Sequence, residues 1–271
     1  MNRRALAIAA TLAAAGSCHA QLIVGFDDTA SGATTCWEIR VSDGSYAATP
    51  LFSGIDVWSL ASDNVNNRLY VGSGTDLFVY DGSGAPTLLG TTNIGGSATS
   101  FVGYAFSNGR LYATRNIANE GVYEINLTTF EASLVVDYAD ADYDFGGFDY
   151  DETTGAFYGS NDDTSPHGAG LFEIDLAGSI TKIANYPPFT GSGASPDVDG
   201  LAAGAGIAYL VPDEPGEIGR YDIINGVALS PIPNPFGSSE IFSAGAYAPW
   251  IPAPGSLGLL GMTALVARRR R

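Results

Sequence analysis

The sequence is poor in the residues that build disulfides, metal sites and histidine-dependent active sites. It has only two cysteines and two histidines, and one of each lies within the first 20 residues, which leaves Cys36 and His167. One cysteine cannot form an internal disulfide, and one histidine excludes multi-histidine metal sites. No G-x-S-x-G motif accompanies His167. We expect Cys36, within TCWEIR, to be buried in a strand, and His167 to be exposed in a loop.

Basic residues are also scarce between the two ends of the chain. Of 12 lysines and arginines, two lie in the first four residues and four end the chain, so the body holds six against all 29 acidic residues. Such a negative surface repels phosphate backbones, which excludes nucleic acid as an expected partner. The same charge favours divalent cations.

The first 20 residues have the pattern of a secretory signal peptide. Two arginines precede an apolar run, Ala5–Ala15, and small residues follow as far as Ala20. The run is too short to span a bilayer as a mature helix. We therefore expect export, with cleavage by signal peptidase between Ala20 and Gln21. Acylation of Cys18 as a lipoprotein is the alternative, although the usual leucine three residues earlier is absent.

The body repeats one short pattern. Leu22–Ile39 (LIVGFDDTASGATTCWEI) aligns without gaps with Phe157–Ile174 (FYGSNDDTSPHGAGLFEI), and related segments begin at Asn67, Gly109 and Gly206. The spacing between copies is 42 to 51 residues, close to the roughly 40–50 residues of a propeller blade. The central residues of the five copies are Ile23, Tyr70, Tyr112, Tyr158 and Tyr209.

Each copy contains four short strand patterns separated by turns, most of which carry glycine. In the fourth copy we expect strands over 146–151, 156–161, 170–176 and 180–186. No part of the body has a sustained helical period. The pattern predicts an all-β fold: a β-propeller of five four-stranded blades over residues 21–250. A β-sandwich is the alternative, and the blade count is open by one.

The two ends of the body predict how the ring closes. The first copy lacks the strand that precedes the central one elsewhere, because the body begins almost directly at Leu22. A strand of that type, Ser243–Trp250, follows the fifth copy. We therefore expect the C-terminal strand to pair with the N-terminal blade, which removes exposed strand edges.

The last 21 residues combine a proline pair, a short apolar run and an arginine cluster. The run Gly255–Ala267 has 13 residues, short for a spanning helix of about 20. This layout resembles the PEP-CTERM sorting tail of Gram-negative envelope proteins, with Ala253 in place of the usual glutamate. The resemblance implies transient membrane insertion and processing by an exosortase-like enzyme; a permanent tail anchor is the alternative. The motif residues are Ile251, Pro252, Ala253 and Pro254, followed by Arg268, Arg269, Arg270 and Arg271.

The repeat body also resembles propeller-type repeats of other PEP-CTERM proteins, through GFDYDETTGAFYGS at Gly147–Ser160. This second resemblance implies a fold without an activity.

Aspartates are the residues that most suggest a ligand. Asp140, Asp142 and Asp144 alternate, a spacing that in a loop can converge oxygen atoms on Ca²⁺. In a propeller, the loops between second and third strands share a face with the inter-blade loops, so these residues would lie near Asp162 and Asp163. Other acids of this rim include Asp197 and Asp199. Ca²⁺ is the one cofactor suggested, and ordinary solvated charge is the alternative.

Together these patterns predict an exported, non-catalytic protein of the cell envelope or extracellular matrix. The expected partners are envelope polysaccharide or matrix proteins, besides the two processing enzymes and the membrane. A secreted carbohydrate-active enzyme with paired aspartates is one alternative, although no particular acid and base stand out. A permanently tail-anchored binding protein is the other.

Overall fold

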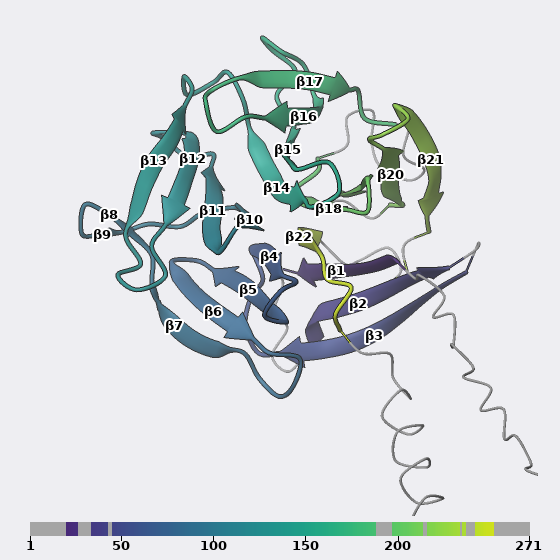
Figure 1. The fold of residues 1–271 in the computed structure, drawn as a ribbon, viewed down its shortest axis with the longest axis horizontal. Coiled ribbons are helices and arrows are strands. Elements are labelled where there is room, and N and C mark those ends of the chain that lie inside the picture. The colour runs from purple at the N-terminus through teal and green to yellow at the C-terminus, as the bar shows by residue number, and fades with distance from the viewer. Residues whose placement is uncertain are drawn as a thin grey trace, which may run out of the picture.

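The computed structural model describes residues 20–26, 34–42, 45–187, 197–213, 216–233, 235–236 and 242–251. Within these ranges every regular element is a β-strand, and twenty strands form five four-stranded antiparallel sheets arranged as a ring (Figure 1). The predicted five-bladed β-propeller is thus confirmed.

Each blade is described from the ring axis outward. Blade 1 is β22 (Phe242–Tyr247), β1 (Ala20–Phe26), β2 (Thr34–Ser42) and β3 (Ser45–Ser53); blade 2 is β4 (Ser59–Asp63), β5 (Arg68–Ser73), β6 (Asp76–Tyr80) and β7 (Thr87–Thr91). Blade 3 is β10 (Gly103–Ser107), β11 (Arg110–Arg115), β12 (Gly121–Ile125) and β13 (Ala132–Asp137). Blade 4 is β14 (Phe145–Asp151), β15 (Ala156–Asn161), β16 (Gly170–Ile174) and β17 (Ile180–Ala184); blade 5 is β18 (Gly200–Gly204), β19 (Ile207–Val211), β20 (Ile218–Asp222) and β21 (Val227–Ile232).

Blade 4 shows how the sequence builds a unit. Its four strands lie within two residues of the ranges expected from the pattern. The turn ETTG joins β14 to β15 through Gly155, whose φ of +73° is readily adopted by glycine. Aromatic residues of these strands pack into one core cluster; Phe148 and Phe157 stack with ring centroids 5.5 Å apart.

Small residues let the inner strands of neighbouring blades approach closely. A Cβ added at Gly147 of β14 would lie 2.7 Å from the backbone nitrogen of Leu201 in β18. At Gly245 of β22 it would lie 3.0 Å from the carbonyl carbon of the same residue. The inner strands therefore pack backbone to backbone around the axis.

The ring closes as the sequence predicts. β22 pairs antiparallel with β1, placing Leu22 opposite Tyr247 and Gly25 opposite Ala244. Cys36 in β2 is fully buried, as expected, and burial raises the pKa of its thiol. The core continues to Ile251, which is 5% exposed and packs with residues of blades 1 and 2.

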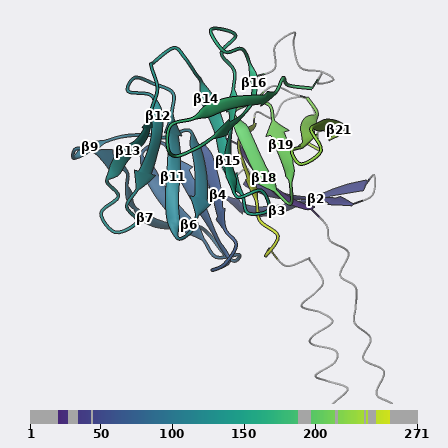
Figure 2. The same ribbon diagram turned by 45° about the horizontal axis from the view of Figure 1, so that its top comes forward.

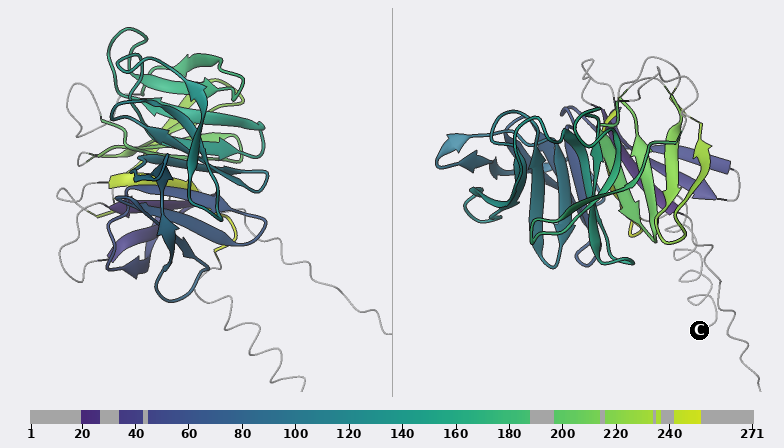
Figure 3. Two further views of the ribbon diagram at one scale, coloured as in Figure 1. Left: turned by 90° about the vertical axis from the view of Figure 1, so that its left-hand side faces the viewer. Right: turned by 90° about the horizontal axis from the view of Figure 1, so that it is seen from above.

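The two faces of the disc differ in what they carry (Figures 2 and 3). We call one the tail face, because β1 begins there and the chain returns there at Ile251. We call the other the loop face, because the loops between second and third strands and the inter-blade loops both lie on it, as the sequence predicts. A short hairpin of β8 (Asn93–Ile94) and β9 (Ser97–Ala98), which we did not predict, projects between blades 2 and 3.

The predicted signal peptide up to residue 19 and the sorting tail from residue 252 onward lie outside the described residues. Cleavage at Ala20–Gln21 and processing of the tail therefore stay predictions. In the described part of the chain, no helix has the length and apolar character needed to cross a membrane.

Candidate functional site

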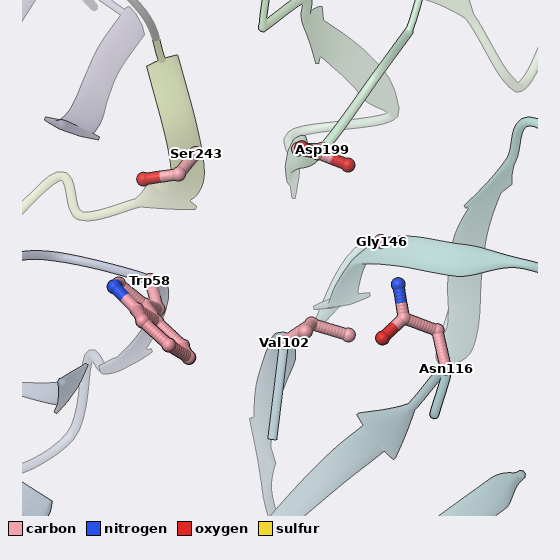
Figure 4. A pocket seen from close by; sticks show the side chains of 6 residues that line it. All are labelled: Trp58, Val102, Asn116, Gly146, Asp199 and Ser243. Atoms are coloured by element: carbon pink, nitrogen blue, oxygen red, sulfur yellow. The ribbon is translucent and has the colours of Figure 1, made fainter. Parts of the chain in front are cut away.

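A cavity of about 190 Å³ opens on the loop face between the inner strands (Figure 4). Each blade contributes one residue to it, from the first residues of its inner strand or the residue just before. Asn116, just after β11, is the sixth lining residue. The lining residues are Trp58, Val102, Gly146, Asp199, Ser243 and Asn116.

The local sequence explains why these positions face the axis. In four of the blades the preceding residue is an apolar side chain that is at most 1% exposed: Val57, Phe101, Phe145 and Val198. The residue that follows is small in every blade: Ser59, Gly103, Gly147, Gly200 and Ala244. The residue between them is anchored on both sides, and it differs in every blade. The five blades thus build a symmetric cavity whose lining side chains are chemically different.

Asn116 presents an acceptor toward the cavity. Its Nδ2 donates a hydrogen bond of 2.8 Å to Oδ1 of Asp144. That bond fixes the amide orientation, so its Oδ1 faces the cavity, where it is buried without a hydrogen-bond partner. The hydroxyl of Ser243 instead donates to the carbonyl of Val57 and points away from the centre.

The indole of Trp58 lines one side of the cavity, and this side chain is 38% exposed. The tyrosines at the repeat positions are core residues, so a tryptophan that is 38% exposed is unusual among the aromatic residues of this body. Its ring offers a flat apolar face beside polar groups.

Asp199 joins the cavity to a cluster of carboxylates. Carboxylate oxygens of Asp162, Asp197 and Asp199 lie within 4.8 Å of one another. A Cβ at Gly146 would be 2.6 Å from Oδ1 of Asp199, so the glycine makes room for this carboxylate. We call Asp162, Asp197 and Asp199 the acid trio.

Asp162 lies in an environment that disfavours its charged form. Burial, together with repulsion from Asp197 and Asp199, raises the pKa of Asp162 to about 9. Its Oδ1 is buried and accepts no hydrogen bond. Burial and the neighbouring Asp162 carboxylate also raise the pKa of Tyr186. The group is therefore held in a place that disfavours its charged form.

Further acids extend this environment across the loop face. Burial raises the pKa of Asp144, and Asp163 and Asp197 add to the effect although the hydrogen bond from Asn116 opposes it. Burial also raises the pKa of Glu120, with contributions from nearby carboxylates. The loop face thus concentrates negative charge around the cavity.

Among the described residues, the five residues predicted to bind calcium do not form one cluster of converging carboxylates. Asp162 alone belongs to the trio, while Asp144 is linked to the cavity through Asn116. Asp140 accepts N–H bonds from residues 119 and 120, at 3.2 and 2.8 Å, and so fastens a loop. Asp142 and Asp163 lie outside the trio, although the Asp163 carboxylate acts on Asp144. The trio takes its other two members from the inter-blade loop before β18.

The one histidine of the body is exposed, as expected, and its ring stacks on Tyr143 with centroids 4.4 Å apart.

Comparisons with known proteins identify the fold. No family model matches the sequence, and no curated protein matches it. A nidogen/laminin complex structure superposes with a TM-score of 0.55 at 10% identity, covering 84% of this chain and 98% of that one. TolB from Acinetobacter baumannii superposes with a TM-score of 0.51 at 13% identity, covering 84% of this chain and 66% of that one. These likenesses support the propeller architecture.

Proposed function

We propose that this chain is an exported, non-catalytic binding protein of the cell envelope. In this proposal the loop face binds the partner, and a PEP-CTERM-like tail directs the protein to the surface. The sequence patterns at the two ends support export and sorting. The propeller fold and the axial cavity support binding.

The separation of the two faces carries the proposal. The side-chain amide of Gln21 donates a 2.7 Å hydrogen bond to the carbonyl of Ile251, so both ends of the folded body meet on the tail face. The cavity and the acid trio lie on the opposite face. A body held through either tail would therefore leave its loop face free to meet a partner.

The solved structures support a binding role more than a catalytic one. One of them is a nidogen/laminin complex, an assembly of two proteins. Within this chain, the trio carboxylates lie within 4.8 Å, near the roughly 5–5.5 Å between the paired acids of retaining glycosidases. However, Asp162 Oδ1 is buried, and the cavity is smaller than the roughly 300–1,000 Å³ typical of small-molecule pockets. The geometry therefore favours binding of part of a larger partner.

Calcium is the metal that this proposal includes. Ca²⁺ takes six to eight oxygen ligands in flexible geometry, and three carboxylates close together fit part of such a shell. A bound cation would also offset the repulsion that raises the pKa of Asp162. We expect millimolar Ca²⁺ to raise the midpoint of thermal unfolding of wild type and to have little effect on Asp162→Asn. Equal shifts in both proteins would contradict a site at the trio.

Two measurements test the proposed function. The intact mass of the protein from its native envelope should correspond to a chain that begins at Gln21 and has lost Arg268–Arg271; retention of these arginines would overturn sorting. The mature protein, immobilised through a C-terminal tag, should also retain a saturable amount of envelope material. Loss of retention in Asp199→Asn but not in Asp81→Asn, an exposed tail-side control, would support the loop face. Equal retention by both variants would overturn it.

A further inference from the structure

We propose that the axial cavity binds a lysine side chain of a partner protein, with the ammonium group between Asp199, Asn116 and Trp58. This inference rests on the proposed binding role of the loop face and names the chemistry that the cavity recognises. It is carried by the size of the cavity, the orientation of Asn116 and the combination of lining groups.

The size of the cavity limits its occupant. Its volume of about 190 Å³ is below the roughly 300–1,000 Å³ of typical small-molecule pockets. It can hold one long side chain but not a compound large enough to fill a typical ligand pocket. A protein partner that inserts one side chain into the mouth of the ring fits this limit.

The polar groups of the cavity select a donor with positive charge. Asn116 Oδ1 is buried and has no donor. The Nδ2 group of the same amide donates to Asp144, which fixes which atom is left as the acceptor. Asp199 supplies a carboxylate beside Asp162 and Asp197, whose carboxylate oxygens lie within 4.8 Å of its own. An ammonium group has three donors and no acceptor, which matches this set.

The apolar groups favour a cation at the end of an aliphatic stem. The indole of Trp58 and the side chain of Val102 line neighbouring parts of the cavity wall (Figure 4). A methylene chain can pack against both, and an ammonium over the indole face gains a cation–π interaction. A bare metal ion would use the carboxylates but neither Trp58 nor Val102. This difference favours lysine over a metal as the occupant of the cavity.

Basic side chains are few in the body of the chain, and three of them lie away from the cavity. The body contains six basic residues, of which Lys182 is the only lysine, and it lies on β17, the outermost strand of blade 4. Its ammonium is 5.9 Å from the centre of the Phe172 ring. Arg40 and Arg110 form ion pairs with Glu38 and Glu124, on strands that place them toward the tail face.

The experiment uses Nα-acetyl-lysine amide as the probe and the EDTA-treated protein after removal of the signal peptide. NMR titration should move the side-chain amide signals of Asn116 and the indole N–H signal of Trp58, with saturation at millimolar probe. Nα-acetyl-norleucine amide and the Nε-acetylated lysine analogue, which lack the charge, should bind at least about tenfold more weakly. Equal binding of a neutral analogue would overturn the proposal.

Matched variants separate a specific cavity from general attraction to an acidic face. Asp199→Asn and Asp163→Asn remove the same charge, but only Asp199 lines the cavity. We expect Asp199→Asn to weaken probe binding about tenfold to a hundredfold and Asp163→Asn less than about threefold. Equal losses would overturn the assignment. So would a cavity in which Ca²⁺ alone moves the Asn116 signals and the lysine probe does not.

Failure of this inference is distinguishable from failure of the proposed function. If the lysine probe does not bind but envelope material is still retained through Asp199, the loop face binds another chemistry. If the probe binds but no envelope material is retained, the cavity has the proposed selectivity and the envelope role is wrong.

Discussion

The buried carboxylates of the tail face and the loop face of this propeller differ in their hydrogen bonding. On the tail face, Asp151 is fully buried and accepts N–H bonds from Thr153 and Gly206, at 2.7 and 2.8 Å. On the loop face, Asp162 faces two other carboxylates, and its buried Oδ1 accepts no hydrogen bond. Both carboxylate oxygens of Asp151 therefore have a donor, whereas one oxygen of Asp162 has none.

Other residues repeat the same contrast. On the tail face, Asp63 accepts from the backbone of residues 65 and 66. Asp149 accepts from the backbone of Tyr150 and Ala203; burial still raises its pKa, while these bonds oppose the rise. On the loop face, Glu120 Oε2 and Asp56 Oδ1 are buried without partners. Acids that accept backbone N–H bonds in turns stabilise the fold, whereas acids with a buried oxygen atom that lacks a donor lower the free energy of unfolding. We infer that the second set is kept for binding.

The largest expected effect is at a tail-face acid. Asp151→Ala removes the acceptor from two N–H groups, and that of Gly206 is buried between blades 4 and 5. Because hydrogen bonds to charged groups contribute about 1.5–3 kcal/mol each, we expect a loss of about 3–5 kcal/mol in the free energy of unfolding. Urea denaturation measures it. Asp151→Asn, which keeps one acceptor oxygen, should lose about half as much. A loss below about 1 kcal/mol for the alanine variant would contradict the role assigned to Asp151.

The next effect has the opposite sign and lies on the loop face. The pKa of Asp162 rises from about 3.9 in the unfolded chain to about 9 in the folded state. Its contribution to stability is therefore complete below about pH 4 and is lost as the pH rises toward 9. Without divalent cations, we expect Asp162→Asn to be about as stable as wild type at pH 5. At pH 8 it should be more stable by on the order of 3 kcal/mol.

Urea denaturation at the two pH values checks this, with Asp163→Asn as a control for the same change of charge. A variant less stable than wild type at pH 8 would show that the Asp162 carboxylate stabilises the fold, as the tail-face acids do.

A smaller effect is expected where the two ends of the body meet. Gln21 Nε2 donates to Glu38 Oε1 at 3.0 Å and to the carbonyl of Ile251, and the side chain is 8% exposed. We expect Gln21→Ala to lower the free energy of unfolding by about 1–2 kcal/mol. Gln21→Glu should cost more above pH 5, because it places a second carboxylate against Glu38. If both variants are as stable as wild type, the hydrogen bonds of Gln21 do not stabilise the fold.

The smallest effect on stability should accompany a large effect on binding. Trp58 is 38% exposed on the loop face, so we expect Trp58→Ala to change the free energy of unfolding by about 0.5 kcal/mol or less and to weaken binding of the lysine probe at least about tenfold. Trp250 is the control, because it lies away from the cavity. Its indole N–H donates a hydrogen bond of 2.8 Å to the hydroxyl of Ser62. Trp250→Phe should cost about 1 kcal/mol and leave probe binding unchanged. If both variants bind the probe equally, Trp58 has no part in the cavity.

The fold was predictable because the residues that determine the strands and turns of a blade lie within a single repeat. Strand patterns and glycine turns lie within single repeats, and the missing first strand and the spare last strand together imply closure. The hairpin β8–β9 was missed even though Gly95–Gly96 is a recognisable two-residue turn. Local chemistry therefore determines most elements of this chain.

The candidate site was predictable only in part, because it depends on contacts between blades. The shared loop face followed from strand order, and the acids of the rim were identified. Which of them meet depends on how blade 5 lies against blade 4, and no single repeat encodes this. The cavity was missed for the same reason, since its lining takes one residue from each of five repeats. In each repeat, a small residue directly follows the residue that lines the cavity. An alignment of the repeats on this small residue would have identified the lining positions.

We infer that the loop face holds Asp162 in an environment that disfavours its charged form until a cation binds nearby. The most direct measurement is a ¹³C NMR titration of the Asp162 carboxyl carbon in EDTA-treated protein, with and without Nα-acetyl-lysine amide. We expect a midpoint near 9 for the protein alone and a lower midpoint when the probe is bound. A midpoint near the ordinary value of about 3.9, unchanged by the probe, would contradict it.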